Sequence, residues 1–228
     1  MSDPANPATP SGPTVAGVPR DALIDLLGLV AYGELLAFDR AAADARLAPD
    51  LKLRAAVSEM ATDRIANHRR VVDRLAELGA EPAAAMAPFL DPLRQYHDLT
   101  APKDWLEALT RAYVGDAVVD DCVREMVRPL DEADRRLVLD VVSDRRYADL
   151  AATELRAAIA ADAKVANRLS MWARRLAGEG LALAARLAAE RPALNLLIGA
   201  SGHGDVRALS GRLVAAHTDR MAAVGLNN

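Results

Sequence analysis

The fold of this chain is decided by one stretch, residues 53–71, which reads LRAAVSEMATDRIANHRRV. Its apolar residues recur at the spacing of one face of an α-helix, and the same stripe continues past the stretch. The members of this stripe are Leu53, Val57, Met60, Val71, Leu75 and Leu78. Arg64 and Asn67 interrupt the stripe three residues apart and therefore share its face. Burying a cation or an amide without partners is costly, so we expect other helices to supply those partners.

The composition is that of an all-helical protein with a sizeable core. The chain has 228 residues, of which 52% are hydrophobic and 4% aromatic, and no segment reads as a series of β-branched strands. The formal net charge of −4 argues against a global attraction to nucleic acid. A single cysteine, Cys122, excludes an internal disulfide and fits a reducing cytoplasm. With no apolar run near the roughly 20 residues of a membrane span and no signal peptide, we expect a soluble cytoplasmic protein with no membrane association.

The hydrophobic periodicity predicts two helical hairpins joined by a long crossover, followed by further helices. Residues 1–20 are rich in Pro, Ser and Thr and are expected to form a disordered tail. The bundle is expected over residues 21–191, and residues 192–228 are expected to form a C-terminal loop and helix beside it. Its helices are predicted at residues 21–47, 51–78, 103–127, 132–161 and 164–191, with a proline-rich crossover at residues 80–102.

Each of the four bundle helices has a polar interruption near the middle of its apolar stripe. The interruptions, in chain order, are Glu34, Arg64 with Asn67, Asp116, and Asp144 with Tyr147. They alternate between a single residue and a pair spaced i, i+3. This alternation matches the ligand layout of di-iron and di-manganese carboxylate bundles, in which two helices give one Glu each and two give Glu-x-x-His.

Four short motifs resemble the ferritin-like proteins related to tRNA methylthio-isopentenyl-adenosine hydroxylase, the MiaE-like group. These motifs are DLLGLVAYGEL at residues 25–35, APF at 87–89, DWLEA at 104–108 and AYVGD at 112–116. The resemblance covers roughly residues 21–190. It implies a ferritin-like four-helix bundle, and it implies that catalytic relatives are non-haem di-iron enzymes that activate dioxygen. A tRNA partner is implied by this resemblance alone.

The residues at the family's ligand positions depart from its pattern. The chain contains no Glu-x-x-His and no Asp-x-x-His, because Arg64 and Asn67 occupy one pair of positions and Asp144 and Tyr147 occupy the other. We therefore expect no metal. Our hypothesis is that the Arg64 guanidinium replaces it, bonded to two of the three carboxylates of Glu34, Asp116 and Asp144.

Three functions remain open at this stage. The first is a hydroxylase-family protein whose di-iron site is lost and whose polar interior has a structural or ligand-binding role, with a small molecule or a protein as the unknown partner. The second is an active di-iron hydroxylase acting on a tRNA base or a small molecule. The third is a helical interaction module that forms a homodimer. The expected binding residues of the first are Glu34, Arg64, Asn67, Asp116, Asp144 and Tyr147.

Overall fold

The computed structural model describes residues 14–15 and 18–227, and this part of the chain is almost entirely helical. The prediction of an all-α helical bundle is confirmed. Two two-residue strands, β1 (Thr14–Val15) and β2 (Val18–Pro19), pair antiparallel before the first helix. The rest of the predicted tail, residues 1–13 and 16–17, lies outside the described residues.

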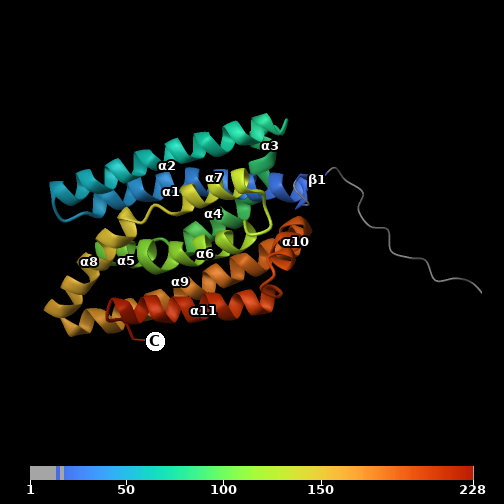
Figure 1. Cartoon of the computed structure of the whole chain (residues 1–228). Helices are drawn as coiled ribbons and strands as arrows, with labels where there is room; N and C mark the ends of the chain where they lie inside the picture. The colour runs from blue at the N-terminus through green and yellow to red at the C-terminus, as the bar shows by residue number, and fades with distance from the viewer. Residues whose placement is uncertain (1–13, 16–17, 228) are drawn as a thin grey trace, which may run out of the picture.

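The first two helices form a long antiparallel hairpin at the upper edge of Figure 1. They are α1 (Arg20–Asp44), which continues into the short 3₁₀ helix η1 (Ala45–Leu47), and α2 (Leu51–Glu77). The Asp50 side chain caps α2 by accepting a hydrogen bond from the N–H of Leu53. The helix ends where Gly79 adopts φ 68°, a conformation that favours glycine.

The proline-rich crossover is ordered and helical. It contains α3 (Pro82–Met86), η2 (Ala87–Phe89) and α4 (Leu90–Leu99). The backbone of α3 passes directly over α1 at Gly28, where a Cβ atom would lie 2.2 Å from the Ala85 carbonyl oxygen. A glycine at this position lets the crossover return across the bundle in close contact with α1.

The third arm of the bundle is continuous but not uniformly α-helical. It comprises α5 (Trp105–Thr110), a π-helical segment η3 (Arg111–Gly115) and α6 (Asp116–Met126). A π segment accommodates an extra residue in the helix and rotates the side chains that follow it. Asp116 comes directly after this segment.

The fourth arm corrects one prediction. The expected helix over residues 132–161 is broken into α7 (Glu132–Val142) and α8 (Arg146–Ala161). The Asp144 side chain accepts a hydrogen bond from the N–H of Arg146 at 3.0 Å, a local turn just before α8 begins. Short polar residues compete in this way with continued helical hydrogen bonding.

Three C-terminal helices complete the molecule. They are α9 (Ala163–Glu190), α10 (Pro192–Ala200) and α11 (Val206–Ala223). In Figure 1, α9 and α11 lie along the lower edge, and both pack against α6. Buried apolar residues from α1, α6, α9 and α11 belong to one continuous cluster. Within the part of the chain that the structure describes, no helix is long and apolar enough to cross a membrane.

Candidate functional site

Three of the predicted residues meet where α1 faces α2. The Glu34 carboxylate is buried and accepts hydrogen bonds from Arg64, at 3.1 and 3.5 Å, and from the amide of Asn67 at 3.3 Å. The Asn67 amide also donates to the carbonyl oxygen of Val141, at 3.5 Å. Burial raises the pKa of Glu34, and the bonds from Arg64 and Asn67 partly offset this effect. The i, i+3 pair on α2 therefore supplies the partners of one buried acid.

A second ion pair lies beside the first. Asp116 follows the π segment on the third arm, and its Oδ1 lies 3.0 Å from an Nη atom of Arg40 on α1. Arg64 therefore does not bridge two carboxylates, as the sequence hypothesis proposed, because a different arginine neutralises Asp116. Nothing in the apolar stripe of α1 singled out Arg40, which lies six residues after Glu34 and is half-buried.

These two ion pairs line an interior cavity of about 80 Å³. Besides the pairs, its polar wall contains Tyr96 from α4 and Asp120 from α6, and its apolar wall includes Val119. Two buried polar atoms of this wall have neither a hydrogen bond nor an ion-pair contact in the part of the chain that the structure describes. They are the Tyr96 hydroxyl oxygen and Arg40 Nε. Buried polar groups are usually hydrogen-bonded, so these atoms need partners that the protein does not supply.

Asp120 is an additional acid in the cavity wall. Sequence analysis missed it, because adjacent acids such as Asp120 and Asp121 usually face solvent. Burial, reinforced by the nearby Asp116 carboxylate, raises the pKa of Asp120 to about 7. Among the described residues, no arginine or lysine forms an ion pair with Asp120. The third carboxylate of the wall therefore differs from Glu34 and Asp116, which are both paired.

A third ion pair, also missed from the sequence, is almost completely buried. Arg111 in the π segment donates two hydrogen bonds to Asp44, at 2.8 and 2.9 Å, and one to the carbonyl oxygen of Thr100 at 3.3 Å. Tyr147 donates its hydroxyl to the same Asp44 carboxylate at 3.0 Å. The predicted residue Tyr147 thus bonds to Asp44 rather than to the Glu34 cluster. Burial and the adjacent Asp44 carboxylate raise the pKa of Tyr147, which keeps it a donor at neutral pH.

Asp144 is placed differently from the prediction. It lies in the break between α7 and α8, where its carboxylate bonds to Arg146 and not to Arg64. The hydrogen bond from Arg146 lowers the pKa of Asp144. Asp144 therefore does not add a third carboxylate to the interior ion pairs. The i, i+3 spacing of Asp144 and Tyr147 loses its meaning because the two residues are not in one helix.

Asp144 and Tyr147 do border a second cavity that adjoins the first. Its volume is also about 80 Å³, and Arg64, Asp116 and Asp120 line both cavities. The second cavity is walled mainly by charged residues of α6, the helix break and α11. Arg64, which pairs with Glu34, therefore borders both cavities.

The donor set does not fit a di-metal centre. Glu34 is engaged by Arg64 and Asn67, and Asp116 faces Arg40, so guanidinium groups occupy the space beside both acids. No histidine lines the cavity, although imidazole is an expected ligand of such sites. Among the described residues, no group of three or more histidine, cysteine or acidic side chains is placed to bind a metal ion.

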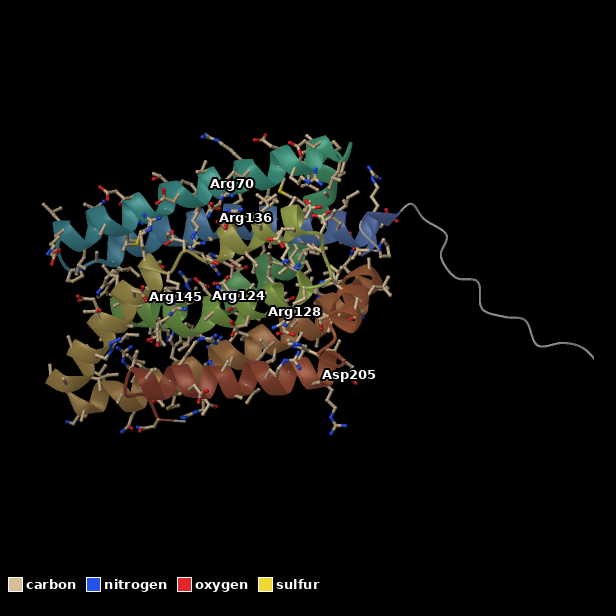
Figure 2. All side chains as sticks on the ribbon, viewed as in Figure 1. Arg70, Arg124, Arg128, Arg136, Arg145 and Asp205 are labelled. Atoms are coloured by element: carbon tan, nitrogen blue, oxygen red, sulfur yellow. The ribbon has the colours of Figure 1, made fainter. Side chains whose placement is uncertain are left out.

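Most of the arginines labelled in Figure 2 are charge-compensated. Arg70, Arg124, Arg128 and Arg145 lie on α2, on α6, at its end and in the helix break. Each of these four forms an ion pair with a nearby acid, at distances of 3.1 to 3.7 Å, whereas Arg136 on α7 forms none among the described residues. The paired acids are Asp140, Asp121, Glu125 and Asp149. A phosphate-binding surface has free positive charge, and pairing reduces it here.

Comparison with known proteins gives one family. A model described as a ferritin-like domain of actinomycetes matches residues 19–201, which includes α1 to α10 and all of the residues that line the first cavity. No curated protein matches the chain.

Proposed function

The chain belongs to the ferritin-like domain family described for actinomycetes, and we propose that it is a metal-independent member that binds a small organic molecule. The molecule would occupy the interior cavity at the position where metal-binding members of this superfamily hold their ions. In the MiaE-like group that the sequence resembles, this protein would be a hydroxylase relative with its di-iron site lost. Glu34, Arg64, Asn67 and Asp116 would form the polar wall of the binding site.

The observation that supports metal independence most directly is the pairing of Arg64 with Glu34. Two carboxylates facing each other in a bundle need positive charge between them, and a metal ion is one source of it. Here Arg64 neutralises Glu34 and Arg40 neutralises Asp116, each through a contact of 3.0 to 3.1 Å. The interior is electrically balanced at these two acids by the chain's own side chains.

The observation that supports ligand binding is the set of unpartnered atoms around the cavity. Tyr96 is 4% exposed, and its hydroxyl has no partner within the described structure. Burying such a group without a hydrogen bond costs about 1–3 kcal/mol. A purely structural role therefore does not account for a hydroxyl group at this position. Apolar side chains such as Leu93 and Leu183 complete the wall, as is typical of small-molecule sites.

The metal part of the proposal is tested by elemental analysis of protein from cells grown with added iron, manganese and zinc. We expect well under one metal ion per chain and the same melting temperature with and without a chelator. About two ions per chain, lost in Glu34→Ala, would overturn metal independence and favour a di-iron hydroxylase. Adventitious surface binding is recognised because Glu34→Ala does not affect it.

The ligand part is tested by screening small molecules for a rise in melting temperature. The wild type is compared with Val119→Trp, which narrows the cavity, and with Val214→Trp, whose parent valine is 48% exposed on α11. We expect stabilising compounds to lose their effect in Val119→Trp and to keep it in Val214→Trp. Stabilisation that is equal in the three proteins, or absent from a diverse screen and from native mass spectra of freshly purified protein, would contradict ligand binding.

A further inference from the structure

The charges that line the interior cavity do not balance. Its wall contains three carboxylates, Glu34, Asp116 and Asp120, and two guanidinium groups, Arg40 and Arg64. Because the two arginines pair with Glu34 and Asp116, the unmatched acid is Asp120. The cavity therefore has room for one more positive charge.

The cations nearest to Asp120 are engaged elsewhere. Arg64 is bonded to Glu34. Arg124 donates one hydrogen bond to Asp121 at 3.1 Å and another to the carbonyl oxygen of Val142 at 2.6 Å. Among the described residues, no side chain forms a hydrogen bond or an ion pair with Asp120. When Asp120 is ionised, a ligand cation can therefore pair with it directly.

The polar wall also offers acceptors for one ammonium group. The Tyr96 hydroxyl belongs to a residue that is 4% exposed, and it has no hydrogen-bond partner in the described structure. Together with the Asp120 carboxylate it gives two acceptor groups on one cavity. A primary ammonium group has three N–H donors and no acceptor, so it can donate to both groups.

An apolar space adjoins this polar wall. A third cavity, of about 60 Å³, shares Leu29, Val119 and Leu183 with the first cavity. Its remaining wall is almost entirely apolar. Among its lining residues are Leu187 of α9 and Ile198 of α10. A dry cavity of about 150 Å³ in another protein accommodates benzene, and the two spaces here approach that size together.

We propose that this site binds a small primary amine, with its ammonium group between Asp120 and Tyr96 and a ring or chain of about six carbons in the apolar space. The assignment rests on the proposed function, because it names the class of ligand for the same cavity. An organic acid of the same size is disfavoured, since its carboxylate would lie beside an unmatched Asp120. A neutral alcohol would leave the charge of Asp120 unbalanced.

The test is isothermal titration calorimetry at pH 8 with three probes of equal shape: cyclohexylamine, cyclohexanol and cyclohexanecarboxylate. We expect the amine to bind best and to lose at least tenfold in affinity in Asp120→Asn. A matched control, Asp140→Asn, removes an acid whose side chain is 52% exposed on α7, and it should leave the affinity unchanged. Tyr96→Phe should weaken amine binding by a smaller factor, because it removes the neutral one of the two acceptor groups.

A second measurement applies even if Asp120→Asn does not fold. Amine affinity in the wild type should rise from pH 6 to pH 8, because Asp120 loses its proton in this range while the amine stays protonated. Binding of the alcohol or the acid that equals or exceeds amine binding would overturn the amine assignment and leave the proposed function intact. If none of the probes binds, the amine assignment fails. The proposed function is then judged separately by the Val119→Trp screen.

Discussion

Arg111 donates two hydrogen bonds from its Nη2 atom to the two carboxylate oxygens of Asp44, at 2.8 and 2.9 Å, and both residues are only 2% exposed. The pair joins the third arm of the bundle to the end of α1. Tyr147 from α8 bonds to the same carboxylate, so three separate helical segments meet at Asp44. Desolvation of both charges makes such a pair sensitive to the loss of either partner.

Replacing Arg111 with Met should therefore destabilise the fold severely. Breaking a buried ion pair by removing one partner costs about 3–5 kcal/mol. Urea denaturation should show this loss in the free energy of unfolding, and the double variant Arg111→Met/Asp44→Leu should recover much of it. The matched control is the exposed pair Arg70–Asp140, where Arg70→Met should cost no more than about 1 kcal/mol. Equal effects at the two sites would show that the buried pair has no special role.

Arg64→Ala should destabilise the protein by about 2–3 kcal/mol, because Arg64 is more exposed than Arg111 and Asn67 still bonds to Glu34. Burial already raises the pKa of Glu34 in the folded state, and losing Arg64 raises it further. A carboxyl group whose pKa is higher in the folded state than in the unfolded state makes the protein less stable as pH rises. The reason is that the folded state then binds more protons than the unfolded state. The deficit of Arg64→Ala should therefore be smaller at pH 5 than at pH 8. Glu34→Gln should restore part of it at pH 8, and a pH-independent deficit would contradict the pairing.

The Glu34 cluster could be predicted from the sequence because its residues break regular apolar stripes. Arg64 and Asn67 lie three residues apart on one helix, and that local spacing is visible without a structure. Gly79 and Asp131 likewise mark a helix end and a helix start through local chemistry.

The pair between Asp44 and Arg111 could not be predicted in the same way. Its members are 67 residues apart. Arg111 also lies in the π segment, where the regular α-helical spacing no longer predicts the direction of a side chain. The interruption of the fourth arm was equally hidden, because the apolar pattern on its two sides is compatible with one helix. The position of Asp144 depends on that interruption. Periodicity describes a helix that continues, and it contains little information about where a short polar residue ends one.

Asp144→Ala should have a modest effect that separates it from the interior acids. Its carboxylate accepts hydrogen bonds from the backbone N–H and the side chain of Arg146, which is exposed. A hydrogen bond of this kind typically contributes about 0.5–1.5 kcal/mol. Chemical denaturation should place this variant well above Arg64→Ala in stability. Amide hydrogen exchange should speed up in the first turn of α8 and remain unchanged around Glu34, and a change around Glu34 would instead assign Asp144 to the interior cluster.

Gly28→Ala should destabilise the bundle despite the better helix propensity of alanine. The added Cβ would lie 2.2 Å from the Ala85 carbonyl oxygen, so α3 must move away from α1. Overpacking of this kind costs about 1–3 kcal/mol. Gly211→Ala in α11 is the matched control, because its Cβ meets no atom within 4 Å, and it should stabilise the protein by up to about 1 kcal/mol. Thermal unfolding should show opposite signs for the two variants, and two gains would contradict the close approach of α3.

Asp120→Asn should make the protein more stable at pH 8 than the wild type and change it little at pH 4. The pKa of Asp120 is about 7 in the folded protein against an ordinary value of 3.8, so the folded state releases its proton with difficulty. The wild type therefore loses stability as pH rises from about 4 to 7, by at most about 4 kcal/mol.

Several titratable or charged groups surround this acid and influence its pKa. They are Glu34 and Arg40 from α1, Arg64 from α2, Tyr96 from α4, Asp116, Asp121 and Arg124 from α6, Asp144, Arg145 and Tyr147 near the helix break, and Arg220 from α11. Urea denaturation over this pH range should give a flatter profile for Asp120→Asn, and carboxyl carbon NMR should show one aspartate titrating near pH 7 that the variant lacks. A saturating amine should lower that titration midpoint, because a bound ammonium group favours the ionised carboxylate. An unchanged midpoint would mean that the amine, if it binds, does so away from Asp120.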